Sequence, residues 1–245
     1  MRYYIDELVI TNYKIKKILI HLAASALVGG IISNKLINTT RWLVITNFSR
    51  KGDCAEVTGE KEHTGLDELI VRNCAPTLAG IKTGSMFPYC CGSRRELMDA
   101  LRLWNRRLGP KGVRMVPLQD TGSRTLLYLF RPDALQKALS NGQAEALLEK
   151  RGYHDICPAS CICRLIGRFR EGGEFPHEVG IFLGYPPEDV CGFIDHKAQG
   201  HKCVGCWKVY GDEAAAKETF RRYKECTREY CAQWAQGRTV EQLTV

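Results

Sequence analysis

Large apolar residues recur at helical spacing in the middle of the chain. They follow one another at intervals of four, three and four residues: Leu97, Leu101, Trp104 and Leu108. This spacing places them on one face of a helix, which Gly109 and Pro110 bring to an end. Ser93 is the predicted N-cap, and Glu96 follows three residues later, as in a reciprocal capping arrangement.

Three more helices are predicted from their start and stop signals. One runs from Pro132 to about Lys150, and another begins at Pro158. The last and longest begins after Asp212, and its wet face carries charge pairs at four-residue spacing: Glu213–Lys217, Glu218–Arg222 and Arg221–Glu225. Its other face carries an aromatic-rich stripe, which we interpret as core and not as a platform for stacking nucleobases.

Short apolar runs bounded by turn residues predict β-strands. The runs from Val113 to Leu118 and from Thr125 to Arg131 predict a hairpin with a glycine-containing loop. Residues 82–88 are predicted to be extended. Two further strands are predicted at Val179 to Leu183 and at Cys206 to Tyr210.

Residues 61–245 are therefore predicted to form one α+β domain, with a small, mainly antiparallel sheet of about four or five strands packed by about four helices. Residues 1–60 fit this domain poorly. They are predicted to be a loosely attached N-terminal appendage, or an extension from a start codon assigned too early, with a linker to about residue 65. The apolar run at 18–32 follows three lysines as in a signal peptide, but it is shorter than the roughly 20 residues of a membrane helix. Membrane attachment is therefore disfavoured.

Composition and charge narrow the class of protein. The chain has 245 residues, of which 44% are hydrophobic and 25% charged, as in an ordinary folded domain. Its net charge of +8 is compatible with a protein that binds nucleic acid. Residues 1–60 carry 8 basic and 5 acidic side chains, however, and residues 61–245 carry 27 basic and 22 acidic side chains. Because the larger part has mixed charge, nucleic-acid binding is disfavoured.

The chain has 12 cysteines, and several of them fall inside apolar patterns. Mostly buried thiols in a reducing cytoplasm are therefore expected, and not a disulfide framework. Cys203 and Cys206 have the C-x2-C spacing of a zinc knuckle, so they are candidate ligands for zinc or iron. A second pair is required for such a site. Cys226 and Cys231 are the nearest candidates in sequence, but five residues of helix turn their side chains about 140° apart.

Polar residues that can move protons lie around the predicted strand at 179–183. His177 and Glu178 precede it, Asp189 follows it, and Lys208 lies on the next predicted strand. These four residues are candidate catalytic residues. The alternative interpretation is that His177 caps the strand and that Glu178 pairs with a basic side chain. Adjacent residues of a strand also point to opposite sides, which separates His177 from Glu178.

Two long motifs resemble a known family. They are the run FPHEVGIFLGYPPEDVCGFI, which begins at Phe175 and is followed by K-C-x-G-x-W-K-V-Y, and LDELIVRNCAPTLAGIKTGSMF, which begins at Leu66. Both resemble the uncharacterised bacterial domain-of-unknown-function family 3793, from about Leu66 to the end of the chain. The resemblance implies no established activity. It suggests a connection with metal or redox homeostasis through neighbouring iron-uptake and flavodoxin genes.

Two hypotheses of different class follow. The first is a cytoplasmic binding or accessory protein that holds a protein or small-molecule partner near the central motif and its thiols. The second is a small enzyme, in which His177 acts as general base, Glu178 or Asp189 orients it, and Lys208 stabilises negative charge. A pocket that unites His177, Asp189 and Lys208 would favour the enzyme.

Overall fold

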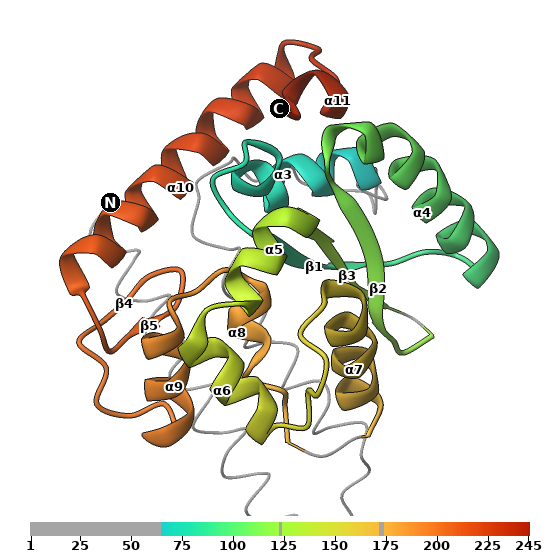
Figure 1. Cartoon of the computed structure of the whole chain (residues 1–245). Coiled ribbons are helices and arrows are strands. Elements are labelled where there is room, and N and C mark those ends of the chain that lie inside the picture. Colours follow the sequence, from blue (N-terminus) through green and yellow to red (C-terminus); the bar gives the residue numbers. More distant parts are fainter. Residues whose placement is uncertain (1–64, 123, 172–173) are drawn as a thin grey trace, which may run out of the picture. The chain divides into compact units, whose positions relative to one another are not determined.

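The computed structural model describes residues 65–122, 124–171 and 174–245. Within these residues the chain forms nine α-helices, one short 3-10 helix and five strands (Figure 1). The predicted α+β class with antiparallel strands is confirmed. The predicted appendage at 1–60, with its apolar run at 18–32, lies outside the described residues. None of the described helices combines the length and the apolar character needed to cross a membrane.

A three-stranded antiparallel sheet organises the domain. Strand β3 (Thr125–Phe130) lies between β1 (Gly84–Tyr89) and β2 (Arg114–Asp120). All six residues of β3 are buried, as expected for a central strand that is covered on both faces. The hairpin predicted from the glycine-containing loop is confirmed as β2 and β3, and the predicted extended segment at 82–88 contains most of β1.

Four helices share one apolar cluster with this sheet. They are α3 (Leu66–Leu78), α4 (Arg94–Leu108), α10 (Glu213–Ala235) and α11 (Val240–Leu243). The stripe predicted for α4 is buried along its whole length. Ser93 accepts a hydrogen bond from the Glu96 amide at 3.2 Å, as predicted, whereas the Glu96 carboxylate accepts from the Gly92 amide and not from Ser93.

The segment from Pro132 to Lys150 contains two helices, and the prediction of one continuous helix is wrong. Helix α5 (Pro132–Leu139) ends at Ser140, and α6 (Gly142–Lys150) begins after Asn141. The Asn141 side chain accepts hydrogen bonds from the amides of Gln143 and Ala144, which is the geometry of an N-cap. A strong capping residue followed by glycine therefore starts a new helix here. Helix α7 (Pro158–Arg170) has Pro158 in its first turn, as predicted.

The segment predicted as a strand at Val179 to Leu183 is also helical. It forms the single turn α8 (Val179–Phe182), and all four residues are buried. A short apolar run has the same appearance in a buried strand and in a buried helical turn, so periodicity does not separate the two. After α9 (Pro187–Asp195), the chain forms a separate two-stranded sheet of β4 (Cys203–Val204) and β5 (Lys208–Val209).

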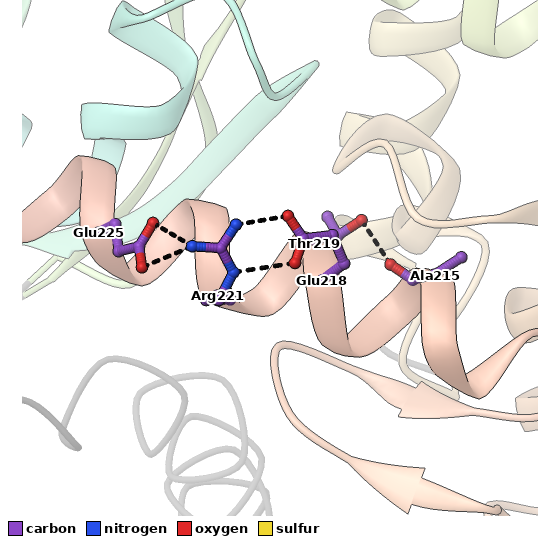
Figure 2. Close-up of polar contacts among 5 residues, drawn as sticks. All are labelled: Ala215, Glu218, Thr219, Arg221 and Glu225. Atoms are coloured by element: carbon purple, nitrogen blue, oxygen red, sulfur yellow. Dashed lines mark hydrogen bonds and ion pairs between the residues drawn. The ribbon is translucent and has the colours of Figure 1, made fainter.

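The wet face of α10 carries ion pairs, two of which were predicted. Lys217 pairs with Glu213, and Arg221 pairs with Glu225. The predicted Glu218–Arg222 pair is not among the close ion pairs of the described residues: the Glu218 carboxylate pairs with Arg221 at 2.6 Å (Figure 2), and Arg222 attracts it from farther away. Arg221 thus lies between two carboxylates on the helix surface. Arg222 lies on the side of the helix that carries Thr219 and Tyr223.

The sheet is joined to α8 by one buried hydrogen bond. The Tyr128 hydroxyl on β3 donates to the Phe182 carbonyl at 2.6 Å, and both residues are fully buried. We expect Tyr128→Phe to lower the free energy of unfolding by about 1–3 kcal/mol, because it leaves a buried carbonyl without its donor. Urea denaturation measures this change.

Tyr89→Phe is the matched control for this prediction. Tyr89 ends β1 on the same sheet, and its hydroxyl makes no hydrogen bond within the described residues. We expect this variant to change stability by less than about 0.5 kcal/mol. Equal losses in the two variants would show that the Tyr128 hydrogen bond does not join the sheet to α8.

Candidate functional site

A buried carboxylate fixes the geometry around the start of α9. Asp189 is only 3% exposed, yet it accepts three hydrogen bonds. Trp207 Nε1 donates to one carboxylate oxygen at 2.6 Å, and the amides of Tyr210 and Gly211 donate to the other at 2.7 Å each. Hydrogen bonds to an ionised acceptor are the strong ones in proteins. Asp189 therefore holds the β4–β5 hairpin and the Trp207 ring against α9.

Gly211 makes this close approach feasible. A Cβ atom at Gly211 would lie 2.7 Å from Glu188 Cγ and 3.4 Å from Asp189 Oδ1. The first of these distances is too short for two carbon atoms. The absence of a side chain thus lets the main chain of Gly211 donate to Asp189 just before α10 begins.

Aromatic rings form a layer beside Trp207. The Tyr185 ring stacks on Trp207 with a centroid distance of 4.8 Å, and the Phe220 ring meets Trp207 edge-on at 4.5 Å. The Lys82 ammonium lies 5.8 Å from the ring centroids of both Tyr185 and Tyr223. These distances are typical of cation–π contacts. The segment around Tyr185, the β4–β5 hairpin and helix α10 thus meet in one aromatic cluster.

Lys82 has no anionic partner among the described residues. Its side chain makes no hydrogen bond or ion pair there, and its main neighbours are the two tyrosine rings and the thiols of Cys206 and Cys74. Burial lowers the pKa of Lys82 below its ordinary value of 10.5, and the interaction with Cys206 opposes that shift only in part. Burial of the Tyr223 hydroxyl raises the pKa of Tyr223 to about 12.

A groove of about 280 Å³ lies between the start of α9 and the first half of α10. Its apolar lining comes from Ile81, Pro186, Trp207, Ala216 and Tyr223.

The polar lining of this groove includes two charges that form no close ion pair within the described part of the chain. Asp189 accepts its three hydrogen bonds from Trp207, Tyr210 and Gly211. Asp212 caps α10 by accepting a hydrogen bond from the Ala215 amide. Thr219 donates its hydroxyl to the Ala215 carbonyl at 2.9 Å (Figure 2). Glu188 and Arg222, in contrast, make no hydrogen bond or ion pair with any residue that the structure describes. One unpaired acid and one unpaired base thus face the same groove.

Glu178 belongs to a different, buried network. It is fully buried, and its Oε1 accepts from Arg168 Nε at 3.1 Å and from the Tyr153 hydroxyl at 3.2 Å. Its Oε2 has no hydrogen-bond partner among the described residues. The hydrogen bond to Glu178 raises the pKa of Arg168, and burial raises that of Tyr153. The alternative interpretation of Glu178, as the partner of a basic side chain, agrees with this geometry.

His177 and Lys208 lie against the same ring of α9. The His177 and Phe193 rings are 4.9 Å apart between centroids, and Lys208 Nζ lies 5.9 Å from the Phe193 centroid. Lys208 donates to the Ala198 carbonyl at 2.8 Å. The structure thus brings His177 and Lys208 close to α9, but the Asp189 carboxylate points to Trp207. Neither His177 nor Lys208 lines the groove.

Cys203 lies in β4 and Cys206 in the turn that joins β4 to β5. Both are free thiols, as are the other cysteines that the structure describes. Within the described part of the chain, no group of three or more histidine, cysteine, aspartate or glutamate side chains is placed to hold a metal ion. Zinc or iron binding by Cys203 and Cys206 stays a prediction. Burial raises the pKa of Cys206, which favours its thiol form.

The groove residues on α10 were not predicted as functional. Tyr223 was assigned to the core stripe and Arg222 to an ion pair, and Thr219 was given no role, because helical spacing alone cannot show that one part of a stripe faces an open groove. The signal in the sequence that could have indicated the groove is the pair Arg222 and Tyr223, which follows Trp207 and the capping residue Asp212 along the chain.

Comparison with known proteins gives one match. The model of the family described as "Protein of unknown function (DUF3793)" matches residues 70–244. This range covers the sheet, its helices, the hairpin and the groove. No curated protein and no solved structure matches the chain.

Asp189→Asn tests the role of the buried carboxylate. The amide would turn its NH2 group toward one of three N–H donors, so we expect a loss of about 2–4 kcal/mol in the free energy of unfolding. Urea denaturation followed by circular dichroism measures the stability, and the tryptophan emission of each protein minus that of its Trp207→Phe version reports the burial of Trp207. Asp195→Asn, at an exposed position on the same helix, is the control and should leave both unchanged. Unaltered stability in Asp189→Asn would refute this role.

Lys82 predicts a specific dependence of stability on pH. Because its pKa is lower in the folded protein than its ordinary value of 10.5, the unfolded chain binds more protons between the two values. The stability of the wild type should therefore rise relative to Lys82→Met as pH increases through that window toward 10.5. Unfolding free energies of both proteins across this range give the difference. Lys137→Met, which replaces an exposed lysine, should show no such trend.

Proposed function

The chain belongs to this family of unknown function, and we propose that it is a binding protein whose ligand is a short, elongated zwitterion, such as a small peptide. The observation that carries the proposal is the groove with Glu188 and Arg222 at its wall, neither of which forms an ion pair with a residue that the structure describes. A ligand ammonium would pair with Glu188, and a ligand carboxylate would pair with Arg222. Arginine suits the second role because its planar fork matches a carboxylate.

The lining of the groove supports a ligand with an apolar body. Trp207, Tyr223 and Pro186 supply flat, rigid surfaces that lose little conformational entropy when they are covered. Asp189 holds the Trp207 ring in place before any ligand arrives. A preformed surface of this kind favours binding, because less ordering is needed on association.

The spacing of the two charges sets the length of the ligand. Glu188 lies against Gly211, just before α10, whereas Arg222 lies ten residues after the N-cap Asp212. A helix rises about 1.5 Å per residue, so the two ends of the groove are about 15 Å apart along the helix axis. An extended peptide spans about 3.3–3.6 Å per residue. Side chains of both residues line the groove and shorten this span, so a peptide of about two to four residues would fill it.

Three of the four residues predicted for catalysis are held by other contacts, which favours binding over the enzyme hypothesis. Asp189 is saturated by three donors, Lys208 is bonded to a carbonyl, and Glu178 is enclosed with Arg168. A general base must reach the proton that it removes. The two charges without partners lie instead where a ligand can meet them.

Thermal unfolding with defined peptides tests this function. A mixture of free tripeptides should raise the melting temperature, because ligand binding to the folded state stabilises it by mass action. The same mixture with acetylated N-termini and amidated C-termini should have little effect, since both end charges are removed. Arg222→Ala and Glu188→Ala should each abolish the stabilisation by free peptides.

Arg228→Ala is the matched control, because Arg228 is an exposed arginine on the same helix and outside the groove. It should respond to free tripeptides as the wild type does. Equal stabilisation by free and blocked peptides, or no stabilisation by either, would contradict the proposal.

A further inference from the structure

The net positive charge of the domain is concentrated in one segment. Residues 65–245 carry 26 basic and 21 acidic side chains. The segment from Arg94 to Arg114, which contains α4 and the start of β2, carries seven of the basic and two of the acidic side chains. The rest of residues 65–245 carries 19 basic and 19 acidic side chains. The whole excess of positive charge therefore belongs to α4, the turn that follows it and Arg114 at the start of β2. A field of one sign on one element steers ligands of the opposite sign.

Much of this charge is available to a partner. Arg94, Arg95 and Arg106 are exposed and form no ion pair with any described residue. Arg102 pairs with Asp99 at 2.9 Å, but both side chains are about 60% exposed, at 64% and 60%. An exposed pair of this kind contributes little and exchanges readily for a stronger partner.

An apolar groove lies next to these arginines. It has a volume of about 430 Å³ between α4 and β2, and we call it the basic groove. Met98, Met115 and Pro117 contribute its apolar surface, and Arg102 and Arg106 also line it. Met98 is 37% exposed, which makes it one of the few large apolar side chains at the surface of the described residues. Methionine is flexible and adapts to different apolar partners.

The edge of β2 indicates how a partner would bind. Asn105 on α4 accepts from the Met115 amide at 2.9 Å and donates to the Met115 carbonyl at 2.8 Å. Its amide thus occupies the outward-facing main-chain groups at this point of the edge strand, and Pro117 has no N–H to offer. Addition of a further strand is blocked, so a partner must use side-chain contacts.

We propose that the basic groove docks an acidic amphipathic helix of a partner protein. Its apolar side chains would cover Met98 and Pro117, above the buried Met115, and its carboxylates would pair with Arg102 and Arg106. This is the helix-in-groove mode of recognition, with charge complementarity at the rim. The proposal is independent of the groove at α10, since the two share no lining residue.

The surface fits an acidic helix better than a nucleic acid. Binding of single strands relies on exposed aromatic rings that stack with bases. Trp104, the aromatic residue of α4, is 6% exposed, and Arg107 lies over its ring at 5.3 Å. The lining of the basic groove contains methionine, leucine and proline, and no aromatic side chain.

Selection from a displayed library of random peptides tests the proposal. Peptides of about 15 residues, which form about four helical turns, are selected on the immobilised full chain. We expect enrichment of peptides with acidic residues and with apolar residues at helical spacing. Synthetic copies should bind about tenfold or more weakly to Arg102→Glu/Arg106→Glu, and also to Met98→Asp, as measured by fluorescence polarisation. Circular dichroism checks that both variants are folded.

Lys224→Glu/Arg228→Glu is the matched control, because it makes the same change of charge at exposed positions on α10. It should bind the selected peptides as the wild type does. Failure to enrich acidic peptides, or equal loss of affinity in the control, would overturn the proposal. A labelled single-stranded or double-stranded oligonucleotide that binds more tightly than the peptides, with the same dependence on Arg102 and Arg106, would replace the peptide by a nucleic acid.

Discussion

The buried carboxylate of Asp189 is the constraint on which the candidate site depends. A charged group in the protein interior is costly unless its hydrogen-bonding capacity is used, and here three N–H groups from one hairpin meet it. The contact joins residues about 20 positions apart in sequence and fixes where α10 begins. The β4–β5 sheet has only two residues in each strand, so it also depends on the packing of Trp207 against Tyr185 and Phe220.

Two surfaces with different chemistry follow from this architecture. The groove at α10 is lined by rigid aromatic rings and by one charge of each sign, which suits a small zwitterion. The basic groove at α4 is lined by methionines and arginines, which suits a longer acidic partner. A protein that binds a small molecule at one surface and a partner at another is a form of the accessory role that the sequence suggested.

Elements whose signal is local were predicted well. The stripe and N-cap of α4, the β2–β3 hairpin, and the starts of α7 and α10 all have the predicted residues in the predicted roles. The errors lie where local signals are ambiguous. Asn141 caps α6 and so divides one predicted helix into two. The apolar run at α8 forms a helical turn, in which the Phe182 carbonyl accepts a hydrogen bond from the distant Tyr128 hydroxyl.

The sequence by itself determined the α+β class, the family and the identity of most helices, because capping residues and apolar periodicity act over a few neighbouring positions. Only the tertiary structure decided the roles of the polar residues. It enclosed Glu178 with Arg168, saturated Asp189 with donors from the hairpin, and left Arg222 beside a groove. The physical reason is that burial and pairing depend on groups far apart in the chain. No local pattern shows which donor will reach a given carboxylate.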